Sequence, residues 1–476
     1  MNLGVLMWVI TLVMCGAFLY ISWKVRSKAL SSFSQYAIGG GTFPLYLIFC
    51  TQFATIMGVG NFVGHAGKGY TIGLPHIAFI LGEQGSKIVF ALAFAALAGA
   101  FTYNTFTEMI DDLLVRDKVT RALGGVLASM IMIAWVGGQG KGFGMIFNIV
   151  TGASPIPIIL FFSAVFILYT TLGGIYSVVW TDLLQGVLVL IFGTVFYIYA
   201  FSPVHWSFAE LGVRMAEVGK AELWSFSNVP AMTMVSKFVT GVIGILAAQI
   251  YWQRCFSAKD GKTARNGLLF SGIIAIVMVM LTALVGMVIL TMKPDLAGDQ
   301  AMPWFMLNYV PVGISAMIFV LILAAGMSSA DSNLNSAAIL VVNDIIRPLK
   351  PNATDKELVK YATIFTVVIG IFAALAAIYA KSIIDLFSKA YAMAGGGLVP
   401  LLVVGLLWKE RSSEAFEMGK KNSKVTPWGA RIGLIVGSVL TQVSALGPNR
   451  VIIALVISAI LVIVVSNLTR GISTKA

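Results

Sequence analysis

Residues 54–61 read Ala-Thr-Ile-Met-Gly-Val-Gly-Asn, and they lie inside an apolar run, 43–63, that is long enough to cross a membrane. The two glycines and the polar side chains of Thr55 and Asn61 predict an interruption of the helix at this point. Backbone carbonyl groups that such an interruption frees need partners inside lipid, and an ion or a substrate can be the partner. The alternative is that the glycines only allow two helices to pack closely.

A similar stretch, Thr240-Gly241-Val242-Ile243-Gly244, lies in the apolar run 233–252, five runs further along the chain. The two interruptions therefore fall in the first helix of two consecutive five-helix units. Because each unit has an odd number of helices, the second unit is inverted in the membrane relative to the first. Paired broken helices in inverted halves indicate the binding site of a transporter.

The chain as a whole is far more apolar than a soluble domain. Hydrophobic residues make up 58% of its 476 residues and charged residues 11%, whereas a soluble domain carries about 25% charged residues. We therefore predict an all-α integral membrane protein with about thirteen transmembrane helices. The expected spans lie near 2–22, 43–63, 75–100, 122–148, 154–172, 177–199, 233–252, 266–292, 313–342, 357–380, 382–407, 430–447 and 450–468.

We expect residues 1–476 to form a single transporter domain, because no loop between the runs is long enough to fold alone. The two five-helix units, helices 2–6 and 7–11, form a 5+5 inverted repeat with one leading helix and two trailing helices. The expected parts are a leading helix and loop at 1–42, a first repeat at 43–199, a second repeat at 233–407 and trailing helices at 430–468.

The net charge of +12 is explained by topology. Most of the 32 lysines and arginines fall on one side of the membrane if the N-terminus is outside and the spans alternate. Loops on the cytoplasmic side carry such an excess of basic residues. The distribution predicts an external N-terminus and an internal C-terminus, in a multi-pass protein of the plasma membrane, such as a bacterial inner membrane. Neither nucleic acid nor an obligate protein partner is implied.

Polar side chains are concentrated in residues 324–336 of the ninth run, where they are costly unless they have partners. Helical spacing places Ser328, Asp331, Ser332 and Asn335 on one face. Hydroxyl and carbonyl oxygens are hard, neutral ligands that alkali cations accept, and the sequence has no cluster of histidine or cysteine that would suit zinc or copper. A further acidic residue, Asp182, is expected near the start of the sixth helix, where capping of that helix would also explain it.

Several blocks of sequence resemble the sodium:solute symporter family. They are GGIYSVVWTDLLQG at 173–186, QRCFSAKD at 253–260 and AGMSS at 325–329, supported by GGGLVP at 395–400. The resemblance implies the inverted-repeat fold of the leucine transporter and sodium-coupled uptake by alternating access.

The resemblance also implies a sodium (Na+) site between the broken second span and the ninth span. Its ligands would be the backbone carbonyls of Ala54, Met57 and Ala325 and the hydroxyls of Ser328 and Ser329. Some members of the family hold a second sodium ion, which here would use Asp182, Ser328 and Ser329. This chain has Ala325 where those members carry a third serine.

The solute is expected to meet polar groups in the centre of the bundle, namely Asn61, Glu83, Gln84, Lys141 and Gln249. Lys141 lies among glycines in mid-span and could pair with a solute carboxylate. Alternatively, Lys141 extends outward or pairs with Glu83, while Glu83 and Lys87, four residues apart, neutralise each other. We favour an organic anion such as a carboxylic acid, an acidic sugar or an amino acid. A neutral sugar or polyol is the alternative, and the glycines at 241 and 244 would leave room for a bulky solute.

A membrane-embedded enzyme is the remaining class of protein to consider. Such an enzyme needs a nucleophile, an acid–base pair or a metal cluster within the membrane. The three histidines, His65, His76 and His205, look scattered near the external side and make a poor metal pair. The sequence therefore predicts a transporter, with a small solute, sodium and the lipid bilayer as its partners.

Overall fold

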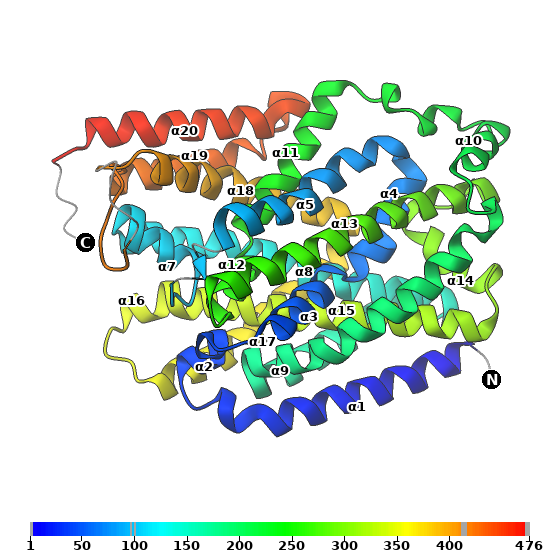
Figure 1. The fold of residues 1–476 in the computed structure, drawn as a ribbon, viewed down its shortest axis with the longest axis horizontal. Helices are drawn as coiled ribbons and strands as arrows, with labels where there is room; N and C mark the ends of the chain where they lie inside the picture. Colours follow the sequence, from blue (N-terminus) through cyan, green and yellow to red (C-terminus); the bar gives the residue numbers. More distant parts are fainter. Residues whose placement is uncertain (1–2, 96–97, 100, 411–416, 472–476) are drawn as a thin grey trace.

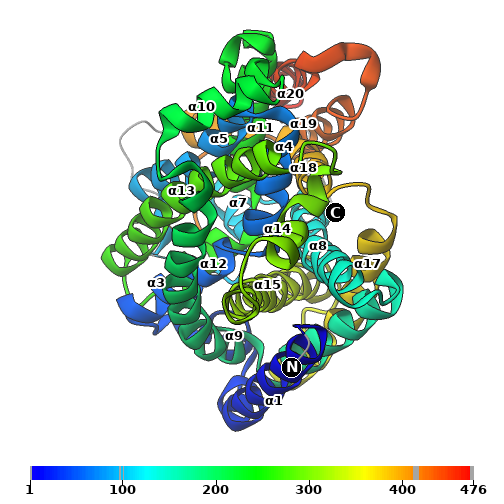
Figure 2. The same ribbon diagram turned by 90° about the vertical axis from the view of Figure 1, so that its right-hand side faces the viewer.

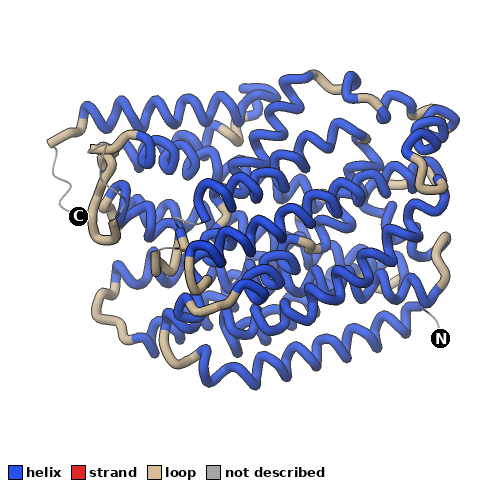
Figure 3. Tube along the Cα trace, viewed as in Figure 1, coloured by secondary structure: helices blue, strands red, loops and turns tan. Residues whose placement is uncertain are grey.

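The computed structural model describes residues 3–95, 98–99, 101–410 and 417–471. Across these ranges the chain is built from helices and loops without a strand, as Figure 3 shows. The first part of the chain contains α1 (Leu3–Ala29), α2 (Phe33–Ile38), α3 (Leu45–Ile56), α4 (His65–Ile72), α5 (Ile77–Phe90), α7 (Phe106–Ile110), α8 (Lys118–Thr151) and α9 (Pro155–Phe201).

The remaining helices continue in the same bundle. They are α10 (Phe208–Glu217), α11 (Ala231–Ala247), α12 (Gln249–Ser257), α13 (Gly261–Met292), α14 (Ala301–Asn308), α15 (Val312–Val341), α16 (Arg347–Leu349), α17 (Asp355–Tyr379), α18 (Ile383–Leu407), α19 (Pro427–Leu440) and α20 (Arg450–Leu468). Figure 2 shows the bundle end-on, with α1 at one edge and α20 at the opposite edge.

Nine helices within the described residues are long and apolar enough to cross a membrane, and two bent helix pairs raise this to eleven. The sequence predicted thirteen spans. The difference arises because α9 passes through two expected spans, with non-helical backbone at Gly174, and because α19 is only 14 residues long. The two ends of the chain lie at opposite ends of the bundle (Figure 1), as an odd number of crossings requires. The orientation in the membrane stays a prediction.

Both spans predicted to be interrupted are bent, but the second bend lies at a different residue from the one predicted. The helix pairs Leu45–Ile56 with Gly60–Ile72 and Ala231–Ala247 with Gln249–Ser257 bend by 48° and 41°. The first break falls at residues 57–59, as expected. The second falls at Ala248, whose φ of −81° and ψ of 112° are extended, and not at residues 240–244.

Gly241 and Gly244 serve close packing within an unbroken α11. A Cβ atom on Gly241 would lie 2.5 Å from the backbone nitrogen of Glu83, and one on Gly244 would lie 2.2 Å from the ring of Tyr391. The prediction that these two glycines leave room for a bulky solute is therefore wrong, because α5 and the ring of Tyr391 fill the space.

Helix α15 lies at the centre of the bundle and carries the polar run predicted from the sequence. It packs against α9, α8, α17 and α3. Residues 321–340 of α15 are all buried, and these include the whole polar run. A polar face that is enclosed by other helices can make hydrogen bonds that lipid could not provide.

Candidate functional site

The break between α3 and the following π-helical turn (Gly60–Gly64) exposes backbone groups in the middle of the bundle. The amide of Asn61 donates to the carbonyl of Ile56, and the backbone N–H of Val59 donates to Oε1 of Gln139 at 2.7 Å. Among the hydrogen bonds that the described residues form outside regular helices, none reaches the carbonyls of Ala54 and Met57. Two carbonyl oxygens of the predicted sodium site are thus available at the break.

The serine pair of α15 lies directly against this break. Oγ of Ser329 donates to the carbonyl of Thr55 at 2.5 Å, and a Cβ on Gly326 would lie 2.6 Å from the side chain of Val59. Ser328 turns the other way and donates to Oδ1 of Asp182 at 2.5 Å. A hydroxyl that donates keeps its lone pairs, so both serine oxygens can still face a cation.

The structure therefore brings together residues 54–57 and 325–329, on which the predicted sodium site depends. Ala54, Met57 and Ala325 are fully buried, and Ser328 and Ser329 are buried between α3, α9 and α15. Five neutral oxygens in such a dry place can replace most of the hydration shell of a sodium ion. Their role as ligands stays a prediction.

Asp182 lies in a second buried polar cluster and does not cap a helix. It lies in the part of α9 that follows the kink at Gly174, where it accepts hydrogen bonds from Thr51 and Ser328. The guanidinium group of Arg254, itself fully buried, lies 3.9 Å from Oδ2 of Asp182 and donates to Oγ of Ser332 at 2.6 Å. The capping interpretation does not hold, because the carboxylate of Asp182 is bound by the hydroxyls of Thr51 and Ser328 and lies about two turns beyond the kink at Gly174.

A second carboxylate, Asp331, belongs to the same cluster. Its Oδ2 accepts a hydrogen bond from Thr181 at 3.4 Å, and it is fully buried. Two carboxyl groups and one guanidinium group share this cluster, and a second cation would offset the negative charge that remains when both carboxyls are ionised. Asp182 and Ser328 from the predicted second sodium site meet here, whereas Ser329 faces the break in α3 instead.

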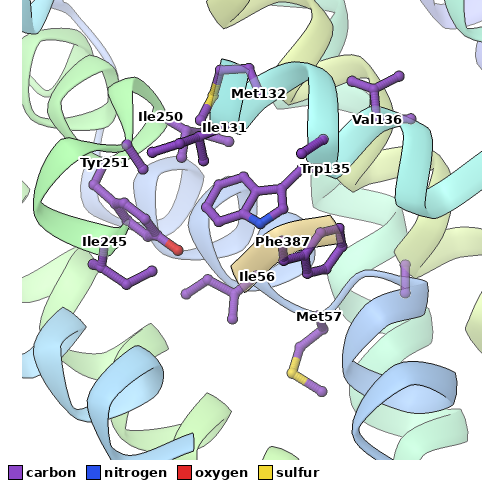
Figure 4. Packing of buried hydrophobic residues seen from close by; sticks show 14 of the residues in the cluster. Ile56, Met57, Ile131, Met132, Trp135, Val136, Ile245, Ile250, Tyr251 and Phe387 are labelled. Atoms are coloured by element: carbon purple, nitrogen blue, oxygen red, sulfur yellow. The ribbon is translucent and has the colours of Figure 1, made fainter. Parts of the chain in front are cut away.

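A small cavity of about 30 Å³ lies beside the break. This volume holds about two water molecules, so the cavity in this structure is too small for an organic solute. Aromatic side chains form much of the wall, and Figure 4 shows Trp135, Tyr251 and Phe387 together with Ile56 and Met57 at the break. The lining is Thr55, Ile56, Gly58, Gly60, Asn61, Glu83, Lys87, Trp135, Gln139, Tyr251, Ser329, Asn333, Phe387 and Tyr391.

Asn61 and Glu83 line this cavity as predicted, and the cation beside them is Lys87. Nζ of Lys87 donates to Oε1 of Gln84 at 2.5 Å, and Nε2 of Gln84 donates to Oε2 of Glu83 at 2.9 Å. The ammonium group also lies over the ring of Tyr251, 5.8 Å from its centroid. Glu83 and Lys87 thus offset each other through Gln84 rather than by direct contact.

Lys141 and Gln249 lie outside the cavity lining. The charge of Lys141 acts on Asp299, where it opposes the burial that raises the pKa of this loop carboxyl. Gln249 is buried and bound to backbone, because its Oε1 accepts from the N–H of Phe106 at 2.8 Å and its Nε2 donates to the carbonyl of Asn104 at 3.1 Å. Gln249 therefore ties the second break to the loop before α7.

Sequence reasoning placed Lys87 in a neutral pair and missed Gln139 altogether. The one-turn spacing of Glu83 and Lys87 was a signal that both side chains share a face of α5. No local signal marked Gln139, since its function depends on Val59 of another helix.

The structure also corrects the prediction that the three histidines are scattered, because two of them are in contact. Nδ1 of His65 lies 2.9 Å from Nε2 of His76, and Nε2 of His65 lies 3.2 Å from Oε2 of Glu83. They meet because the chain reverses at Gly73, which has a positive φ of 73°, and returns His76 to the start of α4. His205 is separate and exposed, next to Glu210.

Comparison with known proteins supports the transporter interpretation. The sequence model of the sodium:solute symporter family matches residues 36–419. The chain is 26% identical over 429 residues to the sodium/sialic acid symporter of Proteus mirabilis (strain HI4320), covering 86% of each chain. It is 24% identical to the sodium/pantothenate symporter of Haemophilus influenzae, covering 92% of this chain and 89% of the relative. Identity to the sodium/glucose cotransporter of Vibrio parahaemolyticus is 23%, over 83% and 79% of the two chains.

Solved structures share the fold. A sodium-coupled sialic acid symporter in a substrate-bound, outward-open state superimposes with a TM-score of 0.79 over 99% of both chains, at 21% identity. A nucleobase-cation-symport-1 family transporter gives a TM-score of 0.61 over 93% of this chain and 96% of its own, at 16% identity. The predicted leucine-transporter-like helical fold is confirmed by these neighbours. With most of its length matched by the family model, this chain belongs to the sodium:solute symporter family.

Proposed function

We propose that this sodium-coupled symporter carries a small organic anion, whose carboxylate binds Lys87 in the central cavity. The observation that supports the proposal is the environment of Lys87. Its ammonium group is buried in the cavity wall, yet its hydrogen-bonding partner is a neutral amide and not a carboxylate. A buried ammonium group has three donors and is stabilised by a negative charge.

The aromatic wall favours a solute with an apolar or planar part. The rings of Trp135, Tyr251, Phe387 and Tyr391 surround the polar groups. Oδ1 of Asn333, also in the lining, is buried without a hydrogen-bond partner and can accept a donor from the solute. Relatives are named for sialic acid and pantothenate, which are carboxylic acids, and others for glucose, which is neutral. A neutral sugar or polyol is thus the second candidate.

The sodium ion of the proposed cycle binds to the carbonyls of Ala54, Met57 and Ala325 and the hydroxyls of Ser328 and Ser329. Binding there joins the broken span to α15 and stabilises one arrangement of the two repeats, which couples the ion to the solute. A second sodium ion beside Asp182, Asp331 and Ser328 would offset the negative charge of that cluster. The proposed protein has its N-terminus outside the cell and consists of two inverted five-helix repeats.

Ser329→Ala is expected to raise the sodium concentration for half-maximal uptake by about tenfold or more, because it removes one of five ligands and the contact with Thr55. Uptake is measured in proteoliposomes with an imposed sodium gradient, and the Hill slope sets a lower bound on the number of ions. Ser315→Ala is the matched control, since Ser315 is a buried serine of the same helix that donates to the carbonyl of Met306. Equal sodium dependence of the two variants, or uptake without a sodium gradient, would rule out the site.

Lys87→Gln is expected to reduce the uptake efficiency of an anionic solute by 10- to 100-fold, at roughly 1.5–3 kcal/mol for a charge-assisted contact. A sodium-dependent thermal-shift screen of sialic acid, pantothenate, glucose and myo-inositol first identifies the solute that binds. Lys141→Gln, a lysine outside the cavity, is the control and should leave uptake nearly unchanged. Tight binding of the neutral solutes alone, or equal loss in both variants, would favour the neutral-solute alternative.

A further inference from the structure

Two of the three histidines are buried side by side next to the solute cavity, and the transport site proposed above does not use them. His65 begins α4, and His76 ends the short helix Leu74–His76. His65 lies between the second ring and a carboxylate, with its Nδ1 2.9 Å from His76 and its Nε2 3.2 Å from Glu83. The histidine pair is thus connected to the cavity through Glu83.

Hydrogen-bond donors converge on Glu83 from both sides. Nε1 of Trp135 donates to the hydroxyl of Tyr391 at 2.8 Å, and that hydroxyl donates to Oε1 of Glu83 at 2.5 Å. An ionised carboxylate only accepts, so Nε2 of His65 must carry the proton on the other side. Nδ1 of a neutral His65 then accepts from Nε2–H of His76, so both rings are uncharged, and Nε2 of His65 faces Oε2 of Glu83 without being aligned for a hydrogen bond.

We propose that the His65–His76 pair is a binding site for one proton, and that this proton binds together with the anionic solute. The proposal rests on the proposed function where it states the charge of the solute. A contact of 2.9 Å between the rings allows one added proton, because charging both rings would place two like charges in contact. The charges of Lys68 and Lys237, from α4 and α11, also act on His76 and oppose a second proton.

Among the groups around the histidine pair, Glu83 is the carboxylate in contact with it. Lys68 is itself paired with Asp385 of α18 at 2.7 Å. Phe79 stacks against His76 and against Tyr391 of α18, whose hydroxyl group carries no charge at neutral pH. Glu83 is therefore the anionic group in contact with the pair, and its charge is offset from the cavity side.

The link to the solute passes from Glu83 to Lys87. In this solute-free structure, Gln84 joins the two side chains, and Lys87 offsets the negative charge of Glu83. An anion bound to Lys87 would take over that ammonium group and leave Glu83 without an offsetting cation. An exposed negative charge beside His65 then favours the protonated pair. Because linkage is reciprocal, a proton on the pair in turn strengthens binding of the anion.

The added proton determines how solute affinity depends on pH. The solute-bound protein holds one proton more than the free protein, so solute affinity falls as pH rises. The fall approaches tenfold per pH unit where the free pair is neutral and the bound pair is charged. One proton would also enter the cell with each anion, in addition to sodium.

The decisive experiment needs no solute, because Lys87→Gln removes the same positive charge that a bound anion would neutralise. Full-length protein labelled with nitrogen-15 histidine in lipid nanodiscs gives signals from three rings, which the variants His65→Gln, His76→Gln and His205→Gln assign. Exposed His205 serves as the internal reference. The titration is recorded by NMR for the wild type, for Lys87→Gln and for the control Lys141→Gln.

We expect the pair to take up one shared proton, and the half-point of this titration to move upward by about one pH unit or more in Lys87→Gln. Lys141→Gln should titrate as the wild type does. Uptake of two independent protons, or a half-point that Lys87→Gln leaves unchanged, would overturn the proposal. Neither result would touch the anion proposal, which is decided separately by solute uptake in Lys87→Gln.

Discussion

Arg254→Leu is expected to lower the midpoint of thermal unfolding of the purified symporter by about 5 °C or more. Arg254 is fully buried between α3, α9 and α15, where it offsets Asp182 and donates to Ser332. Leucine would leave Asp182 and Asp331 in a low-dielectric interior without a cation. Removing one partner of a buried charge pair costs about 3–5 kcal/mol.

A matched arginine and a double variant separate the charge effect from general damage. Arg265 is exposed on α13 near the same end of the bundle, so Arg265→Leu should change the midpoint very little. Adding Asp182→Asn to Arg254→Leu removes one of the two uncompensated charges and should restore part of the lost stability. No recovery in the double variant would show that Arg254 acts through packing and not through its charge.

Gly286→Val is expected to abolish sodium-driven uptake and to destabilise the protein, because α13 and α4 touch through their backbones. A Cβ on Gly286 would lie 1.8 Å from the carbonyl oxygen of Ala66, and one on Gly69 would lie 1.9 Å from that of Ala283. A valine must push α4 away from α13, at a cost of about 1–3 kcal/mol or more for such overpacking. The same shift would move His65 and the part of the broken span that follows the break.

Gly16→Val provides the comparison for this prediction. Gly16 lies within a helix, α1, and a Cβ placed on it would meet no atom within 4 Å. Uptake in proteoliposomes and unfolding temperature are measured for both variants. If Gly286→Val transports and unfolds as Gly16→Val does, the two helices are free to separate and the packing argument fails.

Some features of the site could be predicted from single segments. Gly58 and Gly60 beside polar residues indicated the first break, and the polar run around Ser328 indicated a buried face. Both inferences use only local backbone geometry and the rule that polar groups in a membrane need partners. The positions of Asn61 and Glu83 in the cavity followed from the same reasoning.

The second break and the cavity cation could not be predicted in this way. Gly241 and Gly244 resemble an interruption in sequence, yet the chain bends at Ala248. Lys87 and Lys141 are both lysines of apolar runs, and only the rotation of α5 and α8 in the bundle decides which one lines the cavity. The histidine pair required the reversal at Gly73.

The class of the protein, most of its helical spans and the first break could be read from single segments, because a bilayer penalises every unpaired polar group wherever it lies in the chain. The tertiary structure alone decided which distant side chains meet, as Glu83 meets His65, Lys87 and Tyr391. The tilt and rotation of packed helices set these contacts, and they depend on the shapes of all neighbouring side chains at once.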